Sequence, residues 1–323
     1  MEKDAVKGTI TALLGVFVLG AVLSAITFNG PYAYGANVTN DSVVTRVNVW
    51  NTEPNITGIT IIPDPINLEP GNLTTVTCSV AFFDRNGWRD VTDGGVNATF
   101  YAYPAMKSNS ADDENHHYTN GSCTGNCSGS GNTGSCDCKF KVEYFANAST
   151  WICNATIIDD GGNATTRFFN LSDSKNKSTT ISRLIAIDVP SELDYGNLSV
   201  TEISGQKIVN ITNLGNTHIN VSVRGYGGTG TEVAGENRSM ICAFNDIPVG
   251  MQRYSLENNT QYESMTNVSN SNAVFYPFTL WQRINNNQRE FGRDFNFTYW
   301  RLKIPLTVGG SCNGSLVFSA VEK

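Results

Sequence analysis

Eight cysteines offer the most constrained chemistry in the sequence. Four of them cluster in a short stretch, at Cys123, Cys127, Cys136 and Cys138. Tetrahedral zinc sites favour two matched pairs spaced by two to four residues, whereas one residue separates the second pair here. An even number of cysteines in an exported chain instead predicts disulfides, and no metal. Pairing Cys123 with Cys138 and Cys127 with Cys136 would form a nested ribbon, while the other pairings of the cluster stay open.

Asparagine glycosylation is the second chemistry that the sequence indicates. Of the 37 Asn residues, 20 begin a triplet of Asn, any residue but Pro, then Ser or Thr, where chance would place about a fifth. The alternative is that an Asn- and Thr-rich composition generates such triplets by accident. The predicted acceptors for N-linked glycans are Asn37, Asn40, Asn55, Asn72, Asn97, Asn120, Asn126, Asn147, Asn154, Asn163, Asn170, Asn176, Asn197, Asn210, Asn220, Asn237, Asn258, Asn267, Asn296 and Asn313.

Strand phase supports real glycosylation. In an alternating strand, neighbouring side chains point to opposite faces. Four triplet asparagines lie between apolar neighbours, so we expect them on the solvent face, where a glycan must sit. They are Asn97, Asn154, Asn210 and Asn220.

Metal and catalytic sites find less support. The stretch with Asp112, Asp113, Glu114, His116 and His117 could ligate a metal, but adjacent histidines point to different sides of an extended chain, which favours a solvated polar loop. No serine stands in a nucleophile-elbow context, and the carboxylates are scattered. We therefore expect no enzyme activity.

Calcium is the one cofactor that the sequence leaves open. Asp84, Asn86 and Asp90 alternate oxygen donors that could hold Ca²⁺, as could Asp159 and Asp160. The same residue types are what tight turns require, so a plain turn is the favoured interpretation.

The overall composition narrows the partners. The net charge is −7 and the pI is near 5.0, which removes the usual electrostatic attraction to nucleic acid or an anionic membrane. Charged residues make up only 16%, below the roughly 25% of ordinary soluble domains. Such a surface is polar without being ionic, which is typical of sugar-coated proteins.

The N-terminus contains an uncharged stretch from Thr9 to Phe28, long enough as a helix to cross a bilayer. Lys7-Gly8 directly before it resembles the processing site of archaeal type IV pilins and archaellins, in which a peptidase cuts after a small residue preceded by a basic one. The resemblance implies a mature chain that begins at Thr9 and a helix that packs with its copies in a filament core. The alternatives are secretion with a cut after Gly35 and a retained membrane anchor.

The rest of the chain predicts an all-β fold, because short alternating segments stand between Gly, Asn, Asp and Pro. We expect an N-terminal hydrophobic α-helix or signal over residues 1–36, followed by two immunoglobulin-like β-sandwich domains. The first covers 37–174, with a Cys-rich insert over about 108–137 that is too polar to form a core. A linker covers 175–183, and the second sandwich covers 184–323.

The first domain resembles the immunoglobulin-like domains that are arrayed in archaeal and bacterial surface proteins. The matching residues are Cys78, Trp88 after the Asp84-Arg-Asn-Gly turn, and Cys153 with Trp151 two residues before it. The resemblance implies a disulfide from Cys78 to Cys153 that joins the two sheets under a buried tryptophan.

The second domain has turn phrases that resemble those of archaeal exported proteins and, more distantly, of camelysin-type fibre proteins. They are Leu193-Asp-Tyr-Gly, Asn213-Leu-Gly-Asn and Trp300-Arg-Leu-Lys-Ile-Pro. Cys242 and Cys312 are the only cysteines in this half, so we expect them to pair.

Three functions follow from these observations. The first is a structural, glycosylated subunit of a pilus-like extracellular filament, whose partners are its own copies through the N-terminal helix and the membrane before assembly. The second is an anchored or secreted surface or S-layer-associated glycoprotein with a binding role. The third is a carbohydrate-active enzyme. The mature N-terminus separates the first two.

Overall fold

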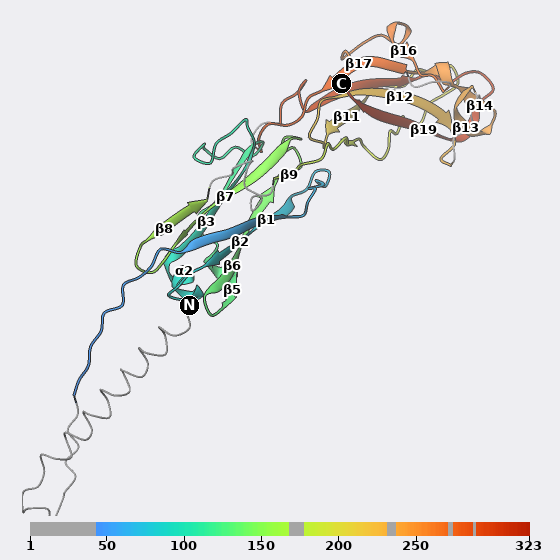
Figure 1. The fold of residues 1–323 in the computed structure, drawn as a ribbon. Helices are drawn as coiled ribbons and strands as arrows, with labels where there is room; N and C mark the ends of the chain where they lie inside the picture. The colour runs from blue at the N-terminus through green and yellow to red at the C-terminus, as the bar shows by residue number, and fades with distance from the viewer. Residues whose placement is uncertain (1–42, 168–177, 231–236, 271–273, 287–288) are drawn as a thin grey trace, which may run out of the picture. The chain divides into compact units, whose positions relative to one another are not determined.

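The computed structural model describes residues 43–167, 178–230, 237–270, 274–286 and 289–323, and the chain divides into two compact units, Met1–Trp50 and Asn51–Lys323. The expected N-terminal helix and the Lys7-Gly8 junction lie outside the described residues. Within the described ranges, no helix combines the length and the apolar character needed to cross a membrane. The expected all-β class is confirmed for the part that the structure describes (Figure 1).

Two antiparallel sheets form the first sandwich. One has the strand order β1-β2-β6-β5, and the other has the order β4-β3-β7-β8, with β9 also pairing β7. The elements are β1 (Asn55–Ile62), β2 (Thr74–Phe83), α2 (Trp88–Gly94), β3 (Gly95–Ala102), β4 (His117–Asn120), the 3-10 turn η1 (Thr124–Asn126), β5 (Cys127–Ser130), β6 (Thr133–Val142), β7 (Thr150–Ile158), β8 (Ala164–Arg167) and β9 (Thr179–Thr180).

Alternation along β2 builds the core as expected. Val76, Cys78 and Val80 are buried, whereas the Thr and Ser residues between them are more exposed. From the facing sheet, Phe100 of β3 and Trp151 of β7 pack into the same core with ring centroids 4.8 Å apart.

The Cys-rich stretch, expected as an insert too polar to form a core, is part of the sandwich itself. Residues 108–137 supply β4, β5 and the first half of β6, and β6 pairs with β2 along its whole length, from Val142 opposite Thr74 to Thr133 opposite Phe83. The stretch lacks large apolar residues, but buried Cys136 and Cys138 alternate along β6 and take the inward positions that such residues would otherwise fill.

Two further segments differ from expectation. Trp88 begins the short helix α2 and is only partly buried, so the fully buried tryptophan of this core is Trp151. Of the residues expected in the linker, Thr179–Thr180 pair with β7, and Ile181 is buried in the first core. Paired backbone and a buried isoleucine thus attach this stretch to the first sandwich.

The second sandwich has two five-stranded sheets, in the orders β10-β11-β18-β15-β16 and β14-β13-β19-β12-β17. Its elements are β10 (Ile187–Asp188), β11 (Lys207–Asn213), β12 (Ile219–Gly227), β13 (Arg238–Phe244), β14 (Asp246–Pro248), the 3-10 turn η2 (Val249–Met251), β15 (Gln252–Ser255), the 3-10 turn η3 (Tyr262–Ser264), β16 (Thr266–Asn267), β17 (Val274–Leu280), β18 (Phe295–Leu302) and β19 (Gly309–Glu322).

The second core is centred on Trp300 of β18, which is fully buried. Val209 and Ile211 of β11 and Ile219 of β12 are buried around it, in the phase that alternation predicts.

Candidate functional site

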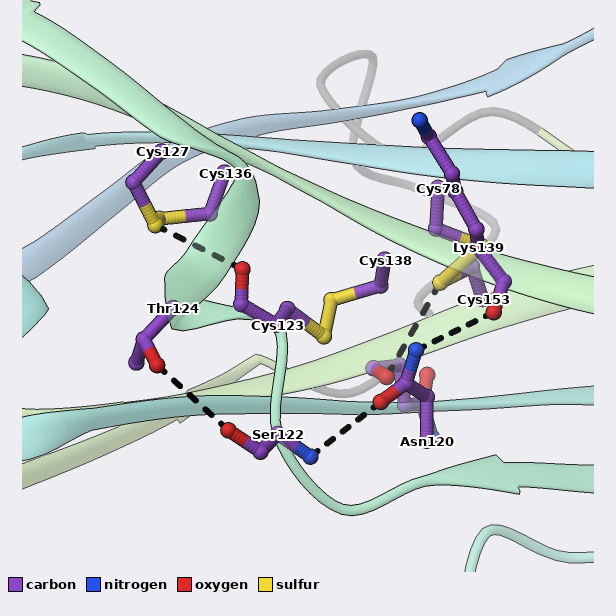
Figure 2. The surroundings of a disulfide bond; sticks show 11 residues. Cys78, Asn120, Ser122, Cys123, Thr124, Cys127, Cys136, Cys138, Lys139 and Cys153 are labelled. Carbon is purple, nitrogen blue, oxygen red and sulfur yellow. Dashed lines mark hydrogen bonds between the residues drawn. A yellow bond between two sulfur atoms is a disulfide. The ribbon is translucent and has the colours of Figure 1, made fainter.

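A disulfide joins the two sheets of the first sandwich. Cys78 on β2 bonds to Cys153 on β7, with Cα atoms 6.4 Å apart (Figure 2). Both cysteines are buried in the core that contains Trp151. The bond therefore ties strands 75 positions apart in the sequence across the sandwich.

The clustered cysteines adopt the nested pairing. Cys123 bonds to Cys138, and Cys127 bonds to Cys136. Around them, Asn120 donates from Nδ2 to the Lys139 carbonyl at 3.0 Å and accepts from the Ser122 amide at 3.1 Å (Figure 2). The described residues form four disulfides, three in the first sandwich and Cys242–Cys312 in the second. Four disulfides indicate an oxidising, extracellular type of environment.

The triplet asparagines lie mostly at the surface. Asn37, Asn40, Asn170 and Asn176 fall outside the described residues. Nine of the others are exposed: Asn55, Asn72, Asn126, Asn163, Asn197, Asn237, Asn258, Asn267 and Asn313. Six are half-buried: Asn97, Asn120, Asn147, Asn210, Asn220 and Asn296.

Asn154 contradicts the expected solvent phase, since only 4% of it is exposed. It lies on β7 opposite Thr99 of β3, and its Nδ2 donates to the Tyr101 hydroxyl at 2.7 Å. Tyr101 in turn stacks on His117, with ring centroids 5.6 Å apart. These side chains cover the outer face of the sheet, so the alternation is intact but the second face is also buried.

Asn97, Asn210 and Asn220 keep the expected phase, since the residue on each side of every one of them is buried. Their side chains are nevertheless half-buried. Asn220 Oδ1 already accepts a hydrogen bond from the Thr279 hydroxyl at 2.8 Å. A glycan acceptor in a strand must point away from the core. How much of its side chain is exposed then depends on the neighbouring strands.

The two adjacent histidines of the first sandwich pair with the two aspartates that precede them in the same stretch. His116 Nδ1 lies 2.9 Å from Asp113 Oδ2, and His117 Nδ1 lies 2.9 Å from Asp112 Oδ1. Burial acts to raise the pKa of Asp112, but hydrogen bonds from Thr119 and His117 outweigh it and hold that pKa below its ordinary value. The two adjacent histidines have different partners, as expected for an extended chain.

The loop that carries these residues also contacts the second sandwich. Asn115 is buried, and its Nδ2 donates to the Arg283 carbonyl at 3.0 Å. Glu114 accepts from the Asn286 amide at 2.6 Å, and the Asn286 side chain also donates to Glu143. A cleft of about 740 Å³ lies between residues 112–118 and Ile284 with Asn285.

Asn216 also belongs to the joint, the set of contacts between the two sandwiches. The sequence did not indicate this role. Its Nδ2 donates to the carbonyls of Ala146 and Ser182, both at 3.0 Å, and its Oδ1 accepts from the Leu184 amide at 2.7 Å. The turn phrase that begins at Asn213 contains it, but a turn signature does not reveal a partner in the other domain.

The carboxylates considered for calcium converge near one end of the first sandwich. Asp84 is fully buried, and its Oδ1 accepts from the Asn86 amide at 2.7 Å. Burial raises the pKa of Asp84 and the charges of Asp90 and Asp159 raise it further, although the Asn86 amide acts in the opposite direction. Asp160 donates its amide to Asp90 Oδ1 at 3.2 Å. Across the described ranges, no group of three or more His, Cys, Asp or Glu side chains is arranged to hold a metal ion.

Comparisons with known proteins add little. No protein-family model and no curated protein matches the chain. Among solved structures, latent PorU from Porphyromonas gingivalis aligns at 12% identity with a TM-score of 0.24, over 84% of this chain and 20% of PorU. The CsuC–CsuE chaperone–tip adhesion subunit complex of Acinetobacter baumannii aligns at 9% identity with a TM-score of 0.32, over 79% of this chain and 96% of that chain.

Proposed function

We propose that this protein is a structural, N-glycosylated subunit of an extracellular, pilus-like filament, with two immunoglobulin-like sandwiches displayed outward. The observation that carries the proposal is the surface of both sandwiches, where nine glycosylation triplets have exposed asparagines on frames closed by disulfides. A glycan requires an exposed acceptor, and a disulfide-clamped frame suits a protein that works outside the cell.

The N-terminal sequence supplies the assembly element of this proposal. A run of 20 residues without charge, Thr9 to Phe28, must be covered by lipid or by copies of itself, because its side chains are too apolar to stay in water. Gly15, Gly20 and several alanines in the run allow close approach between helices. The helix would sit in the membrane before assembly and in the filament core afterwards.

Replacing Gly8 tests the proposal. Gly8→Ile should block processing, leave residues 1–8 on the chain and abolish filaments, while the sandwiches stay folded. Ala5→Ile is the matched control, because it adds the same bulk outside the Lys7-Gly8 junction and should leave a mature N-terminus at Thr9. Mass spectrometry of the terminus and electron microscopy of the cell surface give the readouts.

Two outcomes would overturn it. Normal filaments on cells that carry Gly8→Ile would exclude the pilin-like assembly. A native protein found only as monomers in the membrane, with Met1 retained, would support the anchored surface glycoprotein instead.

A further inference from the structure

One strand of the second sandwich has an unpaired edge. Residues 309–313 of β19 pair with β13, and residues 314–322 pair with β12. Among the described residues, the eight from Ser315 to Glu322 therefore have a neighbouring strand on one side only. A long unpaired edge presents free backbone N–H and C=O groups that can pair with a further strand.

The side chains beside this edge are incompletely covered. Phe318 pairs with Val223 of β12, and Ala320 pairs with Val221, so these residues share the inner face of the sheet. Val221 and Val223 are buried, whereas Leu316, Phe318 and Ala320 are each only half-buried. The core thus closes over β12 but stays open along β19.

A cleft of about 710 Å³ follows this opening. Leu316 and Phe318 of β19 line one side, and Leu193 and Leu198 of the irregular segment after β10 line another. Its only charged lining residues are acidic, Glu192 and Asp194. The cleft thus exposes apolar side chains of β19 beside its free backbone edge.

Residues 43–50 have the matching properties. They form an eight-residue stretch, Val-Val-Thr-Arg-Val-Asn-Val-Trp, that pairs with no strand in the described part of the chain and is drawn as an extended run (Figure 1). Its four valines and Trp50 are 79–89% exposed. Valine favours strands, and alternation places Val43, Val47 and Val49 on one face. The only charge in the stretch is Arg46.

We propose that residues 43–50 of one copy insert beside the open edge of β19 in a second copy and complete its sandwich. The added strand would pair with Ser315–Glu322 and place Val47 and Val49 over Phe318, while Arg46, on its opposite face, would stay in solvent. Backbone pairing gives affinity in this mode of recognition, and alternate side chains in pockets give specificity. The inference uses a different surface from the N-terminal helix and does not depend on filament assembly through that helix.

Hydrogen–deuterium exchange of the full chain in detergent, over a series of protein concentrations, tests this inference. As concentration rises, the amides of 43–50 and the open-edge amides of 315–322 should exchange at least about tenfold more slowly, because both gain backbone partners. Val47→Asp should abolish this protection, since it places a charge on the inward face. Asn48→Asp is the matched control, because it adds the same charge on the opposite face and should keep the protection.

The test separates the possible results. Val47 is exposed, so its replacement does not disturb either core. Exchange of Ser315–Glu322 that does not slow as the concentration rises would overturn the inference, and so would equal effects of Val47→Asp and Asn48→Asp. Protection of 315–322 without protection of 43–50 would show another occupant and would also overturn it. Association with both segments unprotected would leave helix-driven assembly standing alone.

Discussion

The Asn154 side chain donates a hydrogen bond to the Tyr101 hydroxyl at 2.7 Å inside the first sandwich, although Asn154 begins a glycosylation triplet. Burial also raises the pKa of that hydroxyl above its ordinary value. The pair lies under the stacked ring of His117. A glycan on Asn154 would have no room in this arrangement.

Glycopeptide mass spectrometry of the native protein should therefore find Asn154 bare and exposed acceptors such as Asn72 and Asn258 occupied. The physical reason is that attaching a sugar would break the buried hydrogen bond and open the outer face of β7. High occupancy at Asn154 would contradict the described packing. Bare asparagines at all exposed triplets would contradict the proposed glycan coat.

Asn154→Ala should destabilise the first sandwich by about 1–3 kcal/mol, because it leaves the buried Tyr101 hydroxyl without its amide donor. The exposed triplet residue Asn72 provides the control, since Asn72→Ala removes an acceptor that lies in solvent. Denaturant unfolding followed by tryptophan fluorescence measures both. Equal effects of the two substitutions would show that the Asn154–Tyr101 bond adds nothing to stability.

The stability that each disulfide adds to the folded protein should increase with the length of the chain loop that it closes. Replacing Cys78 and Cys153 together by alanine opens a 75-residue separation, whereas replacing Cys127 and Cys136 opens one of nine. The chain-entropy model gives losses of about 4.5 kcal/mol for the long loop and about 2.5 kcal/mol for the short one. Unfolding of both double variants by denaturant, with the other bonds verified by mass spectrometry, measures the difference. The reverse order would mean that local packing outweighs loop entropy.

Asp84 should make the first sandwich less stable as the pH rises. Its pKa is raised in the folded state by burial, so the folded protein holds the proton more tightly than the unfolded chain does. The resulting stability is fully present below the unfolded pKa and is lost as pH rises through the folded pKa. Asp84→Asn keeps an oxygen for the Asn86 amide and should remove this loss, which gives a higher free energy of unfolding at neutral pH.

The exposed Asp93, in the helix α2 that follows Asp84 in the chain, provides the control for that experiment. Asp93→Asn removes a carboxylate that lies in solvent and should leave the shape of the stability profile unchanged. Denaturant unfolding from acid to neutral pH measures both variants. A profile for Asp84→Asn that matches the unsubstituted protein would exclude Asp84 as the titrating group.

The joint between the sandwiches should depend on Asn216. Asn216→Asp retains the shape but replaces two donated bonds, to Ala146 and Ser182, by repulsion between oxygen atoms. We expect the thermal transition of the chain to split or fall and the distribution of sizes in X-ray scattering to widen. Asn245→Asp, at an exposed turn with one bond to the Thr307 carbonyl, should change neither. Unchanged scattering for Asn216→Asp would mean that the joint is held elsewhere.

Sequence period predicts the inward faces of this fold well. Val76, Cys78 and Val80 on β2, and Val209 and Ile211 on β11, are buried as alternation requires. The two-residue alternation shows which side chains share a face of a strand. A face made only of apolar side chains must be buried against another part of the protein.

The outer faces and the joint could not be predicted in the same way. Asn154 is buried because Tyr101 happens to cover it, and this depends on the register between β3 and β7. Asn216 donates hydrogen bonds to the carbonyls of Ala146 and Ser182, which are distant from it in the sequence. The first half of β6 was missed because its buried positions are Cys136 and Cys138, and cysteines indicate disulfides more directly than core positions of a strand.

The two long-range disulfides also limit how far the chain can lengthen under tension. Cys78–Cys153 and Cys242–Cys312 bypass 75 and 70 positions, and a fully extended chain covers about 3.3–3.6 Å per residue. Each bond therefore withholds on the order of 250 Å of contour length from a pulling force, even after the strands around it separate. A molecule stretched from its ends would lengthen only through the segments outside the two loops, and the covalent bridges would carry the load across both sandwiches.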